Sequence, residues 1–142
     1  MEKLSKEDII LIFLENPNLL ARKIEEHKIE KSDEMRQLIC ELGDPDCAYR
    51  YADYIDKVSN NLTRKVACRD SKYAFWYAKH VDNGPHEETR KGACKDPSYA
   101  LYYASQIDKK PTSMTYNSTR MDPFTKNLYR TWVKAQNKYS SS

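Results

Sequence analysis

Four cysteines and three histidines are the residues of this chain best suited to bind metal ions or act as nucleophiles. Cys40, Cys68 and Cys94 recur almost in step with a sequence repeat, as small buried residues do at a helix interface. A zinc site uses paired ligands about two to four residues apart, and the nearest cysteine pair, Cys40 and Cys47, misses that spacing. We therefore predict reduced cysteines in the hydrophobic core and no metal.

Two histidines, His80 and His86, flank the loop of residues 81–85 and resemble a ligand pair. No third cysteine or carboxylate follows at a usual spacing, so we expect both to be solvated loop residues. The sequence also has no glycine-rich phosphate loop and no serine in a nucleophile elbow. These observations predict no catalytic residue and no cofactor, and an enzyme is the least favoured class.

Aromatic residues recur along the chain at a constant interval. Four tyrosines stand in phase: Tyr51, Tyr77, Tyr103 and Tyr129. One residue before the first three stand Arg50, Trp76 and Tyr102, near the edge of the expected apolar face. Two interpretations are open. All of these rings pack between helices, or Trp76 and Tyr102, together with Tyr49 and Phe75, reach the surface, where aromatic residues beside Arg and Lys recognise proteins or stack on bases.

Basic residues form two further groups of candidate binding residues. The first recurs on successive repeats and comprises Arg64, Lys65, Arg90 and Lys91. The second, the basic stripe, has the four-residue spacing of one helix face and comprises Lys126, Arg130, Lys134 and Lys138. A solvated face is the simpler interpretation, but a stripe of one sign also suits an acidic partner or a phosphate backbone.

Charge is distributed unevenly, although the net charge is only +3. Residues 1–46 carry 7 Lys/Arg and 12 Asp/Glu, whereas residues 109–142 carry 7 Lys/Arg and 1 Asp/Glu. The pI of about 8.6 lies below the value of about 9 that usually marks nucleic-acid-binding domains. This uneven distribution of charge, together with the moderate pI, favours a protein partner over a nucleic acid.

A 26-residue repeat must position these residues. Its copies begin at Asp44, Asp70, Asp96 and, in degenerate form, Asp122. Such an aspartate, followed by proline in three copies, is typical of a helix N-terminus. One face of the helix that follows is, in the first copy, Ala48, Tyr51, Ala52 and Ile55. The pattern predicts an all-α protein, a short α-solenoid of helix-turn-helix repeats with a period of about 26 residues.

The predicted organisation is a single helical-repeat domain over residues 1–142. It consists of an N-terminal capping hairpin (1–31), three clear repeats (32–108), a degenerate repeat (109–138) and a tail (139–142). Each clear repeat ends its second helix with an aspartate: Asp56, Asp82 and Asp108. Because the helix dipole disfavours a negative charge there, we expect these carboxylates to accept hydrogen bonds from backbone amides of the following turn.

The two most similar copies, residues 67–78 and 93–104, share the pattern A-C-[RK]-D-[SP]-x-Y-A-x-x-Y-A. This pattern resembles the short A-C-K-D-P-x-Y-A-x-x-Y-A repeats of proteins from tailed bacteriophages and large DNA viruses. The resemblance covers roughly residues 34–108. It implies a helical-repeat fold and a viral origin, and it implies no common catalytic activity.

The leading hypothesis is a non-catalytic macromolecule-binding module, a viral (phage) accessory protein that binds and modulates a host protein. The expected partner is thus a protein, of the host or of the virus. The alternative is a nucleic-acid-binding protein that uses the recurring Arg/Lys residues and the basic stripe. We expect no membrane partner, because no apolar run reaches about 18 residues. The first residues also lack the features of a signal peptide, so we expect a cytoplasmic protein, in the host cytoplasm if it is viral.

Overall fold

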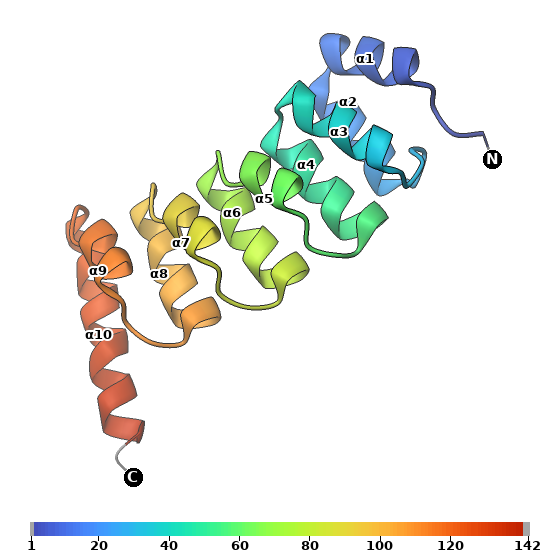
Figure 1. Cartoon of the computed structure of the whole chain (residues 1–142). Coiled ribbons are helices and arrows are strands. Elements are labelled where there is room, and N and C mark those ends of the chain that lie inside the picture. The colour runs from blue at the N-terminus through green and yellow to red at the C-terminus, as the bar shows by residue number, and fades with distance from the viewer. Residues whose placement is uncertain (1, 141–142) are drawn as a thin grey trace. The chain divides into compact units, whose positions relative to one another are not determined.

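Every regular element in the described part of the chain is a helix (Figure 1). The computed structural model describes the backbone of residues 2–140 and the side chains of residues 2–137. Over that range there is no β-strand. The predicted all-α class is confirmed.

The chain divides into two compact units, Met1–Arg69 (unit 1) and Asp70–Ser142 (unit 2). Unit 1 comprises α1 (Lys6–Glu15), α2 (Pro17–Glu25), α3 (Asp33–Leu42), α4 (Pro45–Arg50), the π-helical turn η1 (Tyr51–Asp56) and α5 (Asn61–Ala67). Unit 2 comprises α6 (Ser71–Tyr77), η2 (Ala78–Asp82), α7 (Glu87–Ala93), α8 (Pro97–Tyr102), η3 (Tyr103–Asp108), α9 (Ser113–Thr119) and α10 (Pro123–Ser140). The division falls between the two helices of one predicted repeat. That the whole chain acts as one domain stays a prediction.

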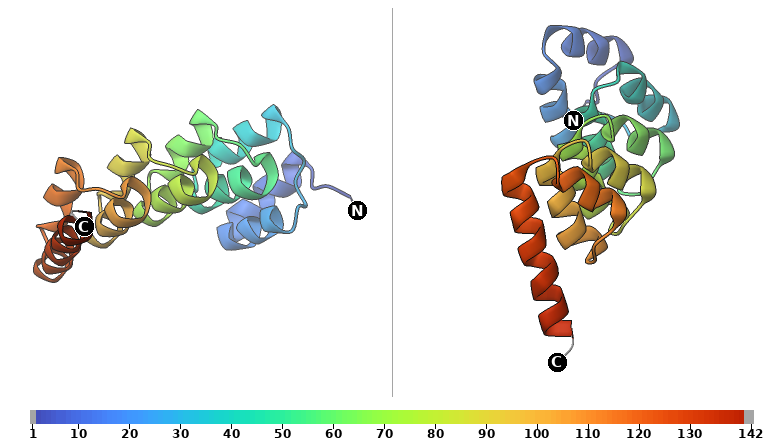
Figure 2. Two further views of the ribbon diagram at one scale, coloured as in Figure 1. Left: turned by 90° about the horizontal axis from the view of Figure 1, so that it is seen from below. Right: turned by 90° about the vertical axis from the view of Figure 1, so that its left-hand side faces the viewer.

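Neighbouring helices within each unit form hairpins that stack on one another. In unit 1, α2 packs against both α1 and α4. In unit 2, α6, α8 and α10 lie in one layer and α7 and α9 in the other (Figure 2). Contacts between successive hairpins of this kind characterise a helical-repeat solenoid, as the 26-residue period predicts.

The repeated aspartates cap the second helices, as their spacing predicts. Asp44 Oδ2 accepts a hydrogen bond from the N–H of Cys47 at 3.0 Å, and Asp96 Oδ1 accepts one from Ser98 at 2.8 Å. Asp122 accepts from both the N–H and the hydroxyl of Thr125, and these bonds lower the pKa of its carboxyl. Each cap satisfies amide groups that have no partner within the helix.

The second helices of the three clear repeats end in a wider, π-helical turn, which the apolar pattern did not predict. These turns are η1, η2 and η3. Each is followed by a residue in the left-handed region: Lys57, Asn83 and Lys109, with φ of 56°, 56° and 58°. After η1, the N–H of Lys57 bonds to Ala52 O at 2.8 Å, five residues back. α10, the corresponding helix of the degenerate repeat, has no such turn.

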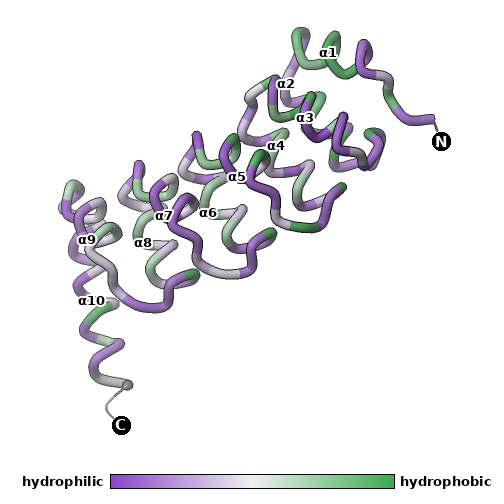
Figure 3. The backbone as a smooth tube through the Cα atoms, viewed as in Figure 1, coloured by the Kyte–Doolittle hydropathy of each residue, from purple (hydrophilic) through white to green (hydrophobic). Residues whose placement is uncertain are grey.

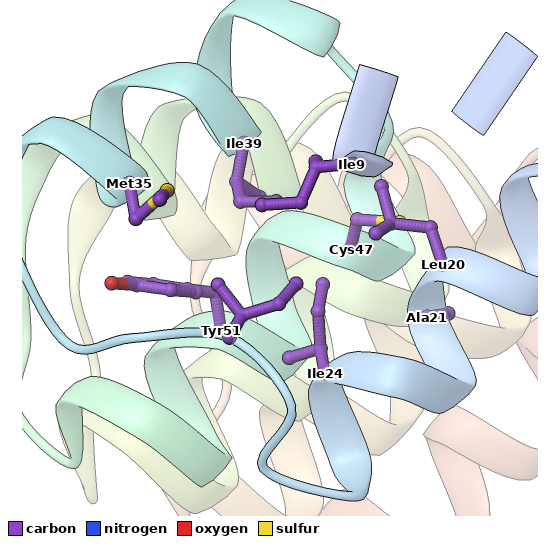
Figure 4. Close-up of a cluster of buried hydrophobic side chains, with 9 residues drawn as sticks. Ile9, Leu20, Ala21, Ile24, Met35, Ile39, Cys47 and Tyr51 are labelled. Atoms are coloured by element: carbon purple, nitrogen blue, oxygen red, sulfur yellow. The ribbon is translucent and has the colours of Figure 1, made fainter. Parts of the chain in front are cut away.

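The core of unit 1 lies between its hairpins (Figure 4). Its fully buried members include Ile9, Leu20, Ile24, Ile39, Cys47 and Tyr51. The Tyr51 hydroxyl donates to Glu30 O at 2.8 Å and accepts from the N–H of Ser32 at 3.1 Å. The ring therefore fills the space between layers while its hydroxyl fixes the start of α3.

The core of unit 2 repeats this arrangement with alanines and tyrosines. Its fully buried members include Ala74, Tyr77, Ala78, Ala93, Ala100, Tyr103 and Ala104. The Tyr103 hydroxyl lies 2.7 Å from Thr89 Oγ1 and accepts from the N–H of His86 at 3.0 Å. The small alanines let the helices approach closely, and the tyrosine fills the gap between them.

Candidate partner-binding surface

Four aromatic side chains of α6 and α8 form what we call the aromatic row: Tyr73, Trp76, Tyr99 and Tyr102. Trp76 is 36% exposed and Tyr102 is 42% exposed, while Tyr73 and Tyr99 are half-buried. Trp76 and Tyr102 thus reach the surface, but the same expectation was wrong for Tyr49 and Phe75, which are only 4% and 5% exposed. Their use in binding stays a prediction.

The rings of the aromatic row hold one another in place. The Tyr73 and Trp76 centroids lie 6.3 Å apart, and those of Tyr99 and Tyr102 lie 5.5 Å apart, both in edge-to-face geometry. Beneath them the buried ring of Phe75 lies 6.0 Å from Tyr99 and 6.1 Å from Tyr102, so it links α6 to α8. Rings packed in this way lose little conformational entropy on binding, which favours recognition.

Lysines lie over this aromatic surface. Lys72 Nζ stands 5.2 Å from the Trp76 ring and 5.4 Å from the Tyr73 ring. Lys79 Nζ stands 5.7 Å from the Phe75 ring and donates to Gln106 Oε1 at 3.1 Å. The surface therefore combines apolar area with positive charge, and both suit a partner that carries apolar and acidic groups.

The same repeat position continues onto α10. Leu128 stands 26 residues after Tyr102, and it is exposed, as is Phe124 one turn earlier. In unit 1 the corresponding residue is Arg50, which donates to Asp46 at 2.6 Å and to Glu25 at 2.5 Å. Exposed apolar side chains at this position are thus a feature of unit 2.

The recurring arginines are largely used inside the fold. Arg90 binds Asp108 with two parallel hydrogen bonds of 2.9 and 2.6 Å, and this bonding raises the pKa of its guanidinium. In unit 1, Arg36 binds Asp56 in the same way at 2.7 and 2.8 Å. Arg64 is only 7% exposed. Arg64 and Arg90 are therefore poorly placed for a partner, whereas Lys65 and Lys91 are exposed.

The expected role of the terminal aspartates was wrong for Asp56 and Asp108. Both side chains are almost fully buried and accept from a guanidinium of the preceding helix, not from amides of the following turn. The physical reason is that a full positive charge offsets a carboxylate at a helix C-terminus better than turn amides do.

The basic stripe on α10 is in part exposed. Arg130 and Lys134 are exposed and Lys126 is half-buried, while the side chain of Lys138 lies outside the described residues.

Arg130 and Lys134 line a pocket of about 570 Å³, the terminal pocket, which the sequence did not predict. Its other lining residues are Pro111, Thr112, Ser113, Tyr116, Tyr129 and Val133.

The cysteines are placed for packing rather than reaction. Cys47 and Cys68 are buried, and Cys40 and Cys94 are half-buried; all four are free thiols. Burial raises the pKa of Cys40 and of Cys94 to about 11, so neither is a reactive thiolate near neutral pH. Among the described residues, no three His, Cys, Asp or Glu side chains come together as metal ligands.

His80 lies within η2 and not in the loop where it was expected, whereas His86 ends that loop, and the two side chains have different surroundings. His86 is the N-cap of α7, and its Nδ1 accepts from the N–H of Glu88 at 3.1 Å. His80 is exposed and packs edge-on against Trp76 with ring centroids 6.2 Å apart. One histidine thus serves the fold, and the other adds a ring beside the aromatic row.

Over the described residues, no helix has the length and apolar character needed to cross a membrane. The viral resemblance of residues 34–108 stays a prediction. Comparison with protein-family models, with curated proteins and with solved structures finds no match to the chain.

Proposed function

We propose that this chain is a non-catalytic protein-binding module whose principal binding surface is the aromatic row. The observation that carries the proposal is the pair Trp76 and Tyr102, both exposed on adjacent helices and both braced by neighbouring rings. Trp and Tyr dominate the binding energy of protein interfaces because they bury much area at small entropic cost. Because neighbouring rings already hold these side chains in place, the aromatic row is a preorganised binding surface.

The partner of the aromatic row is a protein surface with exposed apolar and carboxylate groups. Lys72, which lies over the Trp76 ring, and Lys79, which lies over the adjacent Phe75 ring, favour carboxylates beside the apolar contact. The resemblance of the repeats to those of bacteriophages and large DNA viruses adds a context. On that basis the chain is an accessory protein that engages and modulates a host protein in the host cytoplasm.

A nucleic-acid partner is the second candidate function, and the exposed Arg130 and Lys134 favour it. Of the four recurring basic residues, however, only Lys65 and Lys91 are exposed. A net charge of +3 also provides few contacts to phosphates. This candidate predicts binding that is strongly weakened by salt and removed by nuclease treatment.

Site-specific photo-crosslinking tests the proposal directly. A photoreactive phenylalanine analogue replaces Tyr102 in one preparation and Asn117, an exposed residue of α9, in a matched control. Each full-length chain is irradiated in bacterial lysate, with and without nuclease. We expect a protein adduct at position 102 that is absent at position 117 and resists nuclease.

Competition separates a specific adduct from chance contact. Excess unlabelled chain should suppress the adduct at position 102, whereas the Trp76→Ala/Tyr102→Ala chain should compete at least 30-fold less well, a loss of about 2 kcal/mol. Equal labelling at positions 102 and 117 would overturn the proposal. An adduct lost on nuclease treatment would support the nucleic-acid candidate instead.

A further inference from the structure

The outer face of α1 is apolar and is flanked by carboxylates. Leu11 is 64% exposed and Leu14 is 73% exposed, and Ile10 is exposed beside them. Glu7 and Glu15, one helical turn before and after Leu11, are exposed as well. Figure 3 shows how much of α1 is hydrophobic. Exposed apolar side chains gathered on one helix face commonly mark a site of contact with another molecule.

The terminal pocket between α9 and α10 has the opposite charge. Its apolar wall is formed by Tyr116, Tyr129 and Val133, and its two charged lining residues are Arg130 and Lys134. No carboxylate lines it.

The repeat register explains why this pocket is open. Tyr116 and Lys134 stand 26 residues after Arg90 and Asp108, which form an ion pair in the preceding repeat. Where the preceding repeat has this ion pair, the last repeat therefore has the Tyr116 ring and the Lys134 ammonium group. These two groups favour a ligand that is apolar and carries negative charge.

We propose that the outer face of α1 of one copy docks into the terminal pocket of a second copy, so that copies associate head to tail. Leu11 and Leu14 enter among Tyr116, Tyr129 and Val133, and Glu7 and Glu15 face Arg130 and Lys134. A contact between two different surfaces of the same chain is heterologous, and it extends into rings or open chains.

Charge complementarity identifies a second copy as the occupant. Residues 1–46 hold an excess of five negative charges, and residues 109–142 hold an excess of six positive charges. Opposite ends attract and steer the encounter, whereas two acidic ends or two basic ends repel each other. Every copy carries both halves of the contact, and the contact does not involve the aromatic row.

Sedimentation velocity of the full chain tests this association. In 0.1 M salt the mean sedimentation coefficient should rise with protein concentration. In 1 M salt the rise should shrink, because the screening length falls from about 10 Å to about 3 Å. The Arg130→Glu/Lys134→Glu chain and the Glu7→Lys/Glu15→Lys chain should each remain monomeric, and an equimolar mixture of the two should associate.

A charge-matched control is Lys91→Glu/Arg120→Glu, which changes two exposed cations of unit 2 outside the pocket and should still associate. Circular dichroism checks that each variant is folded. Leu11→Ser and Tyr116→Ser, each at an exposed position, provide a second pair of variants that should weaken association without a charge change.

Four results would overturn the inference: a wild-type chain that is monomeric at about 1 mM, reversal variants that associate like the wild type, a control that fails to associate, or a mixture that stays monomeric. Loss of the photo-crosslink at Tyr102 is a separate outcome. It bears on the aromatic row and leaves self-association untouched.

Discussion

The two units use one position of the repeat for different purposes. In unit 1 that position is Arg50, whose guanidinium is held by Glu25 and Asp46 within the unit. In unit 2 it is Trp76 and Tyr102, whose rings are braced by neighbours yet remain exposed. A residue next to the buried face of a helix can thus form ion pairs within its own unit or remain exposed for a partner. The helix that carries it changes little between the two cases.

Other positions of the repeat are used alike in both units. Tyr51 and Tyr103 are fully buried, and each hydroxyl binds the backbone at the start of the preceding helix. Arg36 with Asp56, and Arg90 with Asp108, form the same bidentate ion pair. The comparison therefore separates a shared framework from a surface that differs, and each part can be perturbed separately.

The largest expected effect comes from removing the shared tyrosine. Tyr51→Ala and Tyr103→Ala should each lower the free energy of unfolding by about 3–5 kcal/mol, because each leaves a large cavity and an unsatisfied backbone group. Urea denaturation followed by circular dichroism measures the loss. A strong effect in one unit and none in the other would show that the frameworks are not equivalent.

Breaking the shared ion pair should have a smaller effect. Asp56→Ala and Asp108→Ala should each cost about 1.5–3 kcal/mol, since a largely buried guanidinium loses two charged hydrogen bonds. Lys134→Ala, at the position of Asp108 in the last repeat, should change stability by at most about 0.5 kcal/mol. Comparable losses for Asp108→Ala and Lys134→Ala, measured by urea denaturation, would contradict this distinction.

The smallest expected effect is the pH response of the half-buried thiols, Cys40 in unit 1 and Cys94 in unit 2. Burial raises the pKa of each from 9.0 to about 11, so the folded state keeps a proton that the unfolded state releases. Stability from this source is present below pH 9 and is lost as pH rises toward 11. At pH 8, both thiols should react with iodoacetamide more slowly in the native chain than in urea. Equal rates would contradict their burial.

Much of the framework could be predicted from the sequence because it repeats locally. The 26-residue spacing of Asp44, Asp70 and Asp96 predicts the helix starts, and the in-phase tyrosines predict the buried rings. The π-helical turns could not be predicted this way, because a local shift in backbone hydrogen bonding leaves the apolar pattern almost unchanged.

The surfaces were harder to predict than the framework. Trp76 and Tyr102 were identified because they lie one residue outside the buried tyrosines. The bonding of Arg90 to Asp108 joins residues of two different helices, so periodicity within one helix gives no sign of it. The sign of this ion pair in the sequence was that an arginine and an aspartate recur together at fixed positions of the repeats. The terminal pocket depends on how α9 and α10 pack, which spacing alone does not determine.

The most direct test of the central claim compares two variants against a captured partner. Binding is measured at equilibrium for the wild type, for Trp76→Ala/Tyr102→Ala, and for Lys126→Glu/Arg130→Glu/Lys134→Glu, each shown by circular dichroism to be folded. We predict at least 30-fold weaker binding for the aromatic variant. The charge variant should lose less than about 10-fold, mainly in association rate. The opposite result would be an aromatic variant that binds the partner as tightly as the wild type does and a charge variant that does not bind it. That result would contradict the claim that the aromatic row is the principal binding surface.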